Sequence, residues 1–279
     1  IIPPSIPMLL YCVMTGVSVG ALFMAGIVPG VIVGVSLMFT AWIIARRRGY
    51  KGERRFTWGE RRSAFKEAFW ALMMPVIILG GIYGGIFTPT EAAVVAVVYG
   101  LFIGFFVYRE IRVSNLKTVF VNTAVSTAII MLIIGASSAF SWVITSKRVP
   151  QMVAEGMLSL SSNPVVILLL INLLLLFIGT FMETVASIII LVPVLMPVLA
   201  TIGVDPLHFG IVIVVNLAIG MVTPPLGICL FVSCGIAKIS LEEISRAALP
   251  FILVMILDVL LLTYLPVLSI GLPRLLGLY

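Results

Sequence analysis

Long apolar runs separated by short polar stretches dominate the chain. The runs cover residues 6–45, 68–87, 92–108, 118–146, 164–200 and 251–270. A helix needs about 20 apolar residues to cross a bilayer, and the alternating pattern of barrel strands is not present in these runs. The pattern therefore predicts an all-α polytopic membrane protein.

Composition and charge agree with this prediction. The chain is 62% hydrophobic and 10% charged, with a mean hydropathy of +1.27, whereas soluble domains carry about 25% charged residues. Nine of the 17 Lys and Arg residues fall between Arg46 and Lys66. Basic loops stay on the cytoplasmic side, so we place Arg46–Lys66 and the second charged stretch, Arg109–Lys117, there as loops. Concentrated charge of this kind does not indicate a nucleic-acid partner.

Smaller features have structural interpretations. Thr88-Pro89-Thr90-Glu91 predicts a helix start in which Thr88 caps the helix and Glu91 completes a capping box. Small hydroxyl and amide side chains within residues 118–146 predict a helix surface that faces protein or water. They are Asn122, Thr123, Ser126, Thr127, Ser137, Ser138 and Ser141. Residues 149–160 are expected to form a short amphipathic connector, and the three cysteines to be free thiols. The chain begins Ile-Ile-Pro-Pro, so we expect no signal peptide and interpret it as the later part of a longer protein.

Two interruptions within apolar runs carry the candidate chemistry. In the first, a helix from Pro164 is predicted to stop at Gly179 and restart at Thr180, with Glu183 three residues later. Glu183 then either completes a capping box with Thr180 or contacts an ion or substrate. In the second, a helix stops at Gly220, and Thr223-Pro224-Pro225 is predicted to open the next helix with Thr223 as its cap.

Unpaired backbone at membrane depth is tolerated only where it lines a cavity. Carbonyl and threonine oxygens suit Na⁺, while the amino ends of half-helices attract carboxylates. Asn216 lies one helical turn before Gly220. We therefore predict a Na⁺ site formed by Gly179, Thr180, Asn216, Gly220 and Thr223.

An internal correspondence supports a chain built from repeats. Pro29 follows Pro3-Pro4 at the 25-residue spacing at which Pro250 follows Pro224-Pro225, and a glycine lies part-way along each segment, at Gly16 and Gly235. Broken segments at matching positions of two halves are typical of secondary transporters. An ion channel or a proton-coupled transporter with the same broken helices remains an alternative. The chain carries no HExxH pattern, and its single histidine belongs to no cluster of catalytic residues, which disfavours an enzyme.

Two further ionisable residues, His208 and Asp258, lie in or beside apolar runs. His208, the single histidine, is interpreted as a helix-start residue rather than a metal ligand, because no partner ligands are visible. Asp258 lies in the last apolar run, where it either hydrogen-bonds to a neighbouring helix or relays protons.

Four ordered motifs resemble the large membrane subunit of tripartite ATP-independent periplasmic (TRAP) transporters. They are Ile2-Pro3-Pro4-Ser5-Ile6-Pro7, Gly85-Ile86-Phe87-Thr88-Pro89-Thr90-Glu91-Ala92-Ala93, Asp205-Pro206-Leu207-His208-Phe209-Gly210, and Asn216-Leu217-Ala218-Ile219-Gly220 through Thr223-Pro224-Pro225. The resemblance covers essentially the whole chain. It implies sodium-coupled secondary active import of an organic acid, a dicarboxylate or a sialic-acid-like carboxylate, across the bacterial or archaeal inner membrane. A periplasmic substrate-binding protein would deliver the acid, and a small four-helix membrane subunit would be the partner in the bilayer. No organic cofactor is implied.

The resemblance also implies an inverted-repeat, elevator-type transporter with a re-entrant hairpin and broken helices. Gly179–Glu183 would be the hairpin tip, Gly220–Pro225 the break of its partner helix, and Ile2–Ser5 the break of the first repeat. Residues expected at the substrate or at the first-repeat break are Ile2, Pro3, Pro4, Ser5, Glu183, Pro224 and Pro225. Residues 1–20 and 131–240 would carry the moving part, and residues 21–130 and 241–279 the scaffold. The family's first hairpin precedes these residues, so the first-repeat sodium site is not complete within them.

Overall fold

The computed structural model describes residues 1–50, 54, 56–161, 163–225 and 227–279. In these ranges the regular structure is helical. The α-helices are α1 (Ile6–Thr15), α2 (Val19–Arg47), α3 (Trp58–Tyr83), α4 (Pro89–Phe102), α5 (Val113–Ser146), α6 (Val149–Leu160), α7 (Pro164–Phe181), α8 (Thr184–Thr201), α9 (Pro206–Gly220), α10 (Ile228–Ala237), α11 (Leu241–Tyr264) and α12 (Val267–Leu275). A π-helix, η1 (Ile103–Val107), continues α4.

Seven helical segments of the described chain are long and apolar enough to cross a membrane. They are Val19–Arg47, Trp58–Tyr83, Pro89–Val107, Val113–Ala136, Pro164–Phe181, Thr184–Thr201 and Leu241–Tyr264. The prediction of an all-α polytopic membrane protein is confirmed. The polar residues from Asn122 to Thr127 are exposed on α5, whereas the side chains of Ser137, Ser138 and Ser141 lie outside the described residues.

The chain forms two compact units. One comprises Ile1–Arg47 and Ile134–Tyr279, and the other comprises Arg48–Ile133. The boundaries of these units differ from those of the predicted moving and static segments. That functional division stays a prediction.

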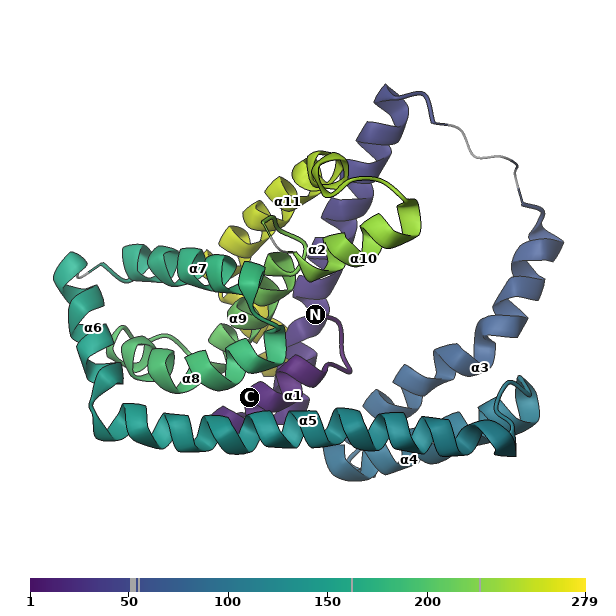
Figure 1. Cartoon of the computed structure of the whole chain (residues 1–279), viewed down its shortest axis with the longest axis horizontal. Helices are drawn as coiled ribbons and strands as arrows, with labels where there is room; N and C mark the ends of the chain where they lie inside the picture. Colours follow the sequence, from purple (N-terminus) through teal and green to yellow (C-terminus); the bar gives the residue numbers. More distant parts are fainter. Residues whose placement is uncertain (51–53, 55, 162, 226) are drawn as a thin grey trace. The chain divides into compact units, whose positions relative to one another are not determined.

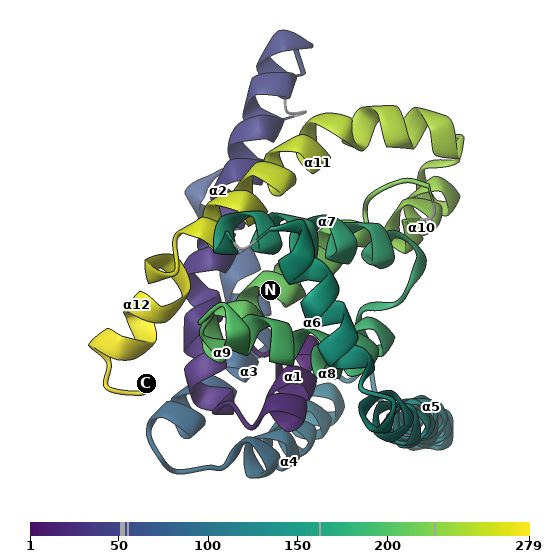
Figure 2. The ribbon, with the colours of Figure 1, turned by 90° about the vertical axis from the view of Figure 1, so that its left-hand side faces the viewer.

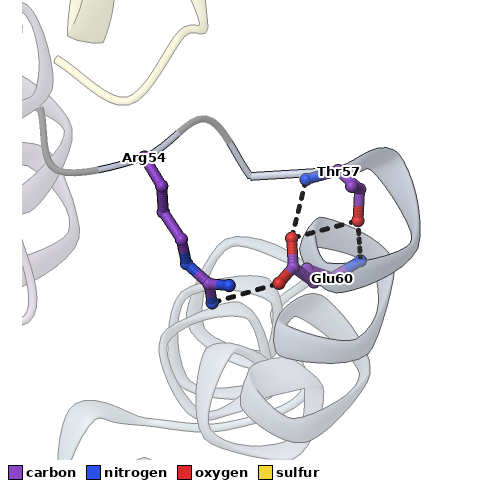
Figure 3. A network of polar contacts seen from close by, with 3 residues as sticks. All are labelled: Arg54, Thr57 and Glu60. Carbon is purple, nitrogen blue, oxygen red and sulfur yellow. Dashed lines mark hydrogen bonds and ion pairs between the residues drawn. The ribbon is translucent and has the colours of Figure 1, made fainter.

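In the second unit, helix starts follow the sequence closely. Figure 3 shows Glu60 accepting hydrogen bonds from the amide of Thr57, at 2.7 Å, and from its hydroxyl, at 3.0 Å. Arg54 forms an ion pair with the same carboxylate at 3.0 Å. Thr88 and Glu91 form the predicted capping box at the start of α4, and Pro89 is its first residue. These caps satisfy amides that a helix start leaves unpaired.

The two basic stretches are only partly loops. Arg46 and Arg47 form the last turn of α2, and α3 begins at Trp58, so the connection between these helices is shorter than the predicted Arg46–Lys66. Cations are favourable at a helix carboxyl end, and the Arg46 guanidinium also lies 4.4 Å from the centre of the Trp42 ring. Likewise α5 begins at Val113, which makes Lys117 helical rather than part of a loop. Residues 51–53 and 55 of the first stretch lie outside the described residues.

In the first unit, α7 and α8 form a hairpin, and α9 packs against both arms (Figure 1). Figure 2 shows α1 beside α9. There the Tyr11 hydroxyl donates a hydrogen bond to the carbonyl of Pro206 at 2.7 Å. A Cβ atom on Gly210 would lie 2.7 Å from the Tyr11 ring and 2.8 Å from Leu22, so glycine permits this close packing. The core of the unit thus joins segments from both ends of the chain.

The internal correspondence extends to whole helices. Each Pro-Pro pair precedes a short helix, α1 or α10, and each of these helices has 10 residues. A long helix with an internal proline follows in both cases, α2 with Pro29 and α11 with Pro250. Both Pro-Pro bonds are cis.

Gly16 and Gly235 occupy different positions relative to their helices. Gly16 ends α1 in a left-handed conformation, with φ 74°, whereas Gly235 lies inside α10. The residue that ends α10 in the left-handed conformation is Lys238, with φ 55°. The end of a helix is defined by this backbone geometry, which glycine favours but other residues occasionally adopt.

Candidate functional site

The connection between α7 and α8 falls within the predicted hairpin tip, Gly179–Glu183, but after the predicted restart at Thr180. Helix α7 continues through Gly179 and Thr180 to Phe181, and α8 begins at Thr184. The Thr180 hydroxyl donates to the carbonyl of Phe177 at 2.7 Å, inside α7. The predicted restart at Thr180, with Thr180 as its cap, is therefore wrong.

Glu183 explains this difference. Its carboxylate accepts hydrogen bonds from the amides of Val185, at 2.8 Å, and Ala186, at 3.2 Å, so Glu183 itself caps α8. An acidic N-cap satisfies two free amides and complements the helix dipole. Of the two interpretations of Glu183, capping is correct in kind, but the capped helix is the one that follows. A contact with an ion or substrate stays a prediction.

The second break is longer than predicted. Helix α9 ends at Gly220, and α10 begins only at Ile228, after Gly227. Thr223 therefore does not cap α10; its hydroxyl donates to the carbonyl of Ile219 at 2.7 Å. A residue that precedes proline is disfavoured from the helical conformation. Both Thr223 and Pro224 precede prolines, which delays the start of the next helix.

The structure brings the two breaks together through a pair of glycines. A Cβ atom on Gly220 would lie 2.5 Å from the Cα and carbonyl carbon of Gly179. A Cβ atom on Gly179 would lie 3.1 Å from the Cα of Gly220. Only residues without a side chain allow the two backbones to approach in this way. The end of α7 therefore rests directly on the end of α9, as the predicted site requires.

The two threonines at the breaks present oxygen atoms with spare acceptor capacity. Each hydroxyl uses its single hydrogen on a backbone carbonyl, Thr180 on Phe177 within α7 and Thr223 on Ile219 near the end of α9. A hydroxyl that donates its hydrogen keeps its lone pairs. Both side chains are thus compatible with coordination of a cation.

Asn216 belongs to a buried polar contact between α9 and α7. Its Nδ2 atom donates to Oδ1 of Asn172 at 2.6 Å and to the carbonyl of Val212 at 2.9 Å. Turning the amide over would place its oxygen against these two acceptors, so the hydrogen bonds fix its orientation. Its Oδ1 atom is buried and has no hydrogen-bond partner among the described residues. The side-chain nitrogen of Asn216 contacts Asn172 and not a helix break. The role of Asn216 as an ion ligand stays a prediction.

The polar contact continues into α11 and α12. Asn172 donates to the Thr263 hydroxyl at 3.0 Å, and His208 lies 3.1 Å from the Thr263 carbonyl and 2.7 Å from the Ser269 hydroxyl. His208 is in the first turn of α9, as expected, and it is buried. Sequence reasoning missed Asn172, although it is the single polar residue in the run 165–178. Within the described residues, no group of three or more His, Cys, Asp or Glu side chains is arranged to hold a metal ion.

The segment Ile2–Met8 packs against the face of α2 that carries Gly26 and Gly30. A Cβ atom on Gly30 would lie 2.5 Å from the side chain of Ile2, and one on Gly26 would lie 2.5 Å from Met8 of α1. Gly26 and Gly30 thus permit a close contact, whereas a Cβ atom on Gly34 would meet no atom within 4 Å. Pro3, Pro4 and Ser5 then lead into α1, as Pro224 and Pro225 lead toward α10.

Comparison with known proteins identifies the family of the chain. Residues 1–268 match the family described as "Tripartite ATP-independent periplasmic transporter, DctM component". The chain belongs to this family. It is 47% identical to the isethionate TRAP transporter permease protein DctMQ of Oleidesulfovibrio alaskensis, covering 95% of this chain and 42% of that protein. It is 42% identical to the C4-dicarboxylate TRAP transporter large permease protein DctM of Pseudomonas aeruginosa (100% and 65%) and 40% identical to the sialic acid TRAP transporter large permease protein SiaM of Vibrio cholerae (99% and 64%).

The chain therefore spans less than two thirds of the length of these TRAP relatives. The resemblance inferred from the four motifs is confirmed, and these relatives are named as transporter permeases rather than as enzymes. A family named for periplasmic transport also agrees with the predicted location in the inner membrane. These comparisons name neither a coupling ion nor the residues of a site.

Proposed function

We propose that this chain contains the substrate-translocating part of a sodium-coupled importer of organic acids in the inner membrane. The observation that carries the proposal is the contact between Gly179 and Gly220, which joins a hairpin tip to the end of a broken helix. Active uptake that does not use ATP must draw on the electrochemical gradient of an ion. Helix ends that meet inside the bilayer can hold a coupling ion between them.

The ion site of the proposal comprises Gly179, Thr180, Asn216, Gly220 and Thr223. The two threonine hydroxyls keep lone pairs for a cation, and the buried Oδ1 of Asn216 has no hydrogen-bond partner in the described chain. Na⁺ prefers oxygen ligands of this kind, which broken helices supply in other secondary transporters.

The substrate is proposed to be an organic anion bound near the two Pro-Pro segments. The residues that precede α1 and α10 are Ser5 and Gly227, and neither forms a side-chain capping bond, although the Cys229 amide in the first turn of α10 donates to the carbonyl of Met221. By contrast, Glu183 occupies the first amides of α8. Free amides at a helix start attract anions. Isethionate, sialic acid and C4-dicarboxylates, for which the three relatives are named, are all organic anions at neutral pH.

The proposed partners are a periplasmic binding protein that delivers the acid and a small four-helix membrane subunit. The name DctMQ of one relative, and the fact that this chain covers 42% of it, agree with a small subunit fused to or paired with the large one. In the proposed cycle, the part that carries the two breaks moves across the bilayer as an elevator.

The test is uptake into proteoliposomes that contain the complete membrane part, with each acid presented by the binding protein. We expect uptake to require an inward Na⁺ gradient and to saturate with substrate. Thr223→Ala should weaken the apparent Na⁺ affinity, whereas Thr223→Ser should largely retain it, because serine keeps the oxygen. Single-channel currents would instead indicate a channel. Uptake driven by a proton gradient without Na⁺ would indicate the proton-coupled alternative.

A further inference from the structure

Helices α2 and α11 pack against one another (Figure 2), and an acid lies between them. Asp258 of α11 is 8% exposed, and its Oδ2 atom forms a short hydrogen bond with the hydroxyl of Ser36 on α2. The same hydroxyl lies 2.9 Å from the carbonyl of Val33. The sodium site proposed above uses none of these residues.

Counting hydrogens assigns the protonation state of this acid. Ser36 has one hydroxyl hydrogen, and the carbonyl of Val33 can only accept. If each contact is a full two-centre hydrogen bond, Ser36 donates to Val33 and Asp258 donates its own proton to the Ser36 oxygen. An ionised Asp258 would take the serine hydrogen and leave the Val33 contact without one.

The surroundings of Asp258 favour the neutral acid. Helix α11 packs against α2, α7, α9 and α10. The titratable or charged groups on these helices are Arg46 and Arg47 at the end of α2, His208 on α9, and Cys229 and Cys234 on α10; α7 has none. His208 is bonded to Thr263 and Ser269 instead. In the described part of the chain Asp258 forms no ion pair. A buried carboxylate without a cation is costly and binds a proton instead.

Ser36 and Asp258 lie far from the basic ends of α2 and α11. Ser36 is separated from Arg46 by ten residues and Asp258 from Arg246 by twelve, which at 1.5 Å per residue correspond to about 15 Å and about 18 Å. Half of the hydrocarbon thickness is about 15 Å. If the arginines mark the membrane surface, the acid lies near mid-depth, where an ionisable residue usually has a function.

We propose that Asp258 is a proton-binding site between α2 and α11 that holds a proton at pH 7. Release of the proton leaves a carboxylate that draws the Ser36 hydrogen away from Val33, so the protonation state is linked to the contact between the two helices. The chain then carries a cation site for H⁺ in addition to the proposed Na⁺ site, from which it is separate.

The chain contains only two aspartates, Asp205 and Asp258, which permits a direct test. The full chain is produced with aspartate that carries ¹³C at its side-chain carboxyl carbon, Cγ. The labelled protein is placed in lipid, and infrared or NMR spectra are recorded at pH 7. We expect one protonated and one ionised carboxyl. Asp258→Asn should remove the protonated signal and leave the ionised one, while Asp205→Asn, which keeps a good helix cap, should do the reverse. Ser36→Ala should shift the protonated signal without removing it.

Two ionised carboxylates in the wild-type chain would overturn the proposal. So would a protonated signal that survives Asp258→Asn, because it would belong to Asp205. The wild-type spectrum alone decides the first point, so the test holds even if one variant fails to fold. None of these spectra depends on sodium or on transport, and failure here would leave the proposed function intact.

Discussion

Replacing Gly220 by alanine perturbs the contact between the two breaks and little else. The new Cβ atom would lie 2.5 Å from two backbone atoms of Gly179, whereas ordinary contacts are 3.4–4 Å. The ends of α7 and α9 must therefore separate by roughly 1 Å, since backbone atoms cannot rotate away as a side chain can. Both segments of the proposed ion site move apart.

The expected cost follows from two opposing terms. Overpacking of this kind costs about 1–3 kcal/mol, and alanine is about 1 kcal/mol better than glycine in a helix. The net loss is up to about 2 kcal/mol. If all of it falls on the ion site, the apparent Na⁺ affinity decreases by up to about 30-fold.

The assay compares Gly220→Ala with Gly34→Ala, where a Cβ atom meets nothing within 4 Å. Thermal unfolding in detergent and Na⁺-dependent uptake are measured for both variants. We expect a lower unfolding temperature and weaker Na⁺ dependence for Gly220→Ala, with Gly34→Ala at least as stable as wild type. Equal behaviour of the two variants would refute the view that the Gly179–Gly220 contact holds the site together.

Three further predictions concern other parts of the chain. Single cysteines in Arg48–Thr57 and Arg109–Arg112, in a background without native cysteines, should resist an impermeant reagent added from the periplasm; labelling of either would reverse the topology. Glu183→Gln should fold normally, because an amide oxygen still accepts hydrogen bonds, whereas Glu183→Ala should lose about 1 kcal/mol of stability in thermal unfolding; equal losses would argue against capping. Asn172→Leu should lower the free energy of unfolding by about 0.6–1.7 kcal/mol, a larger loss than for Leu173→Ala at the neighbouring exposed position. The opposite order would show that the hydrogen bonds of Asn172 do not stabilise the chain.

Helix starts could be predicted where a single local motif defines them. The box formed by Thr88 and Glu91 depends on residues three positions apart, and the structure contains it as expected. The sequence Thr180-Phe181-Met182-Glu183 has the same spacing, yet Glu183 caps the helix that follows. Two local hydrogen-bond patterns were available there, and packing of α7 against α9 through Gly179 extends α7 beyond Thr180.

The long-range contacts could be predicted only in part. Both breaks are visible in the sequence, but the approach of Gly179 to Gly220 depends on how two helices pack. The link from Asn216 to Asn172 connects residues 44 positions apart, and no local pattern pairs them. A lone asparagine in an apolar run does indicate a buried partner, and this rule would have identified Asn172.

The hydrogen bond from Tyr11 to Pro206 has a consequence for biosynthesis. Its partners are 195 positions apart in the chain, and at 5–20 residues per second the ribosome needs roughly 10–40 s to add the second partner. Until then α1 and α2 are in the membrane without helix α9, which begins at Pro206. The residues of the second unit, Arg48–Ile133, have by then all been synthesised. Nascent chains arrested before Pro206 should therefore be the forms most readily recognised by membrane proteases.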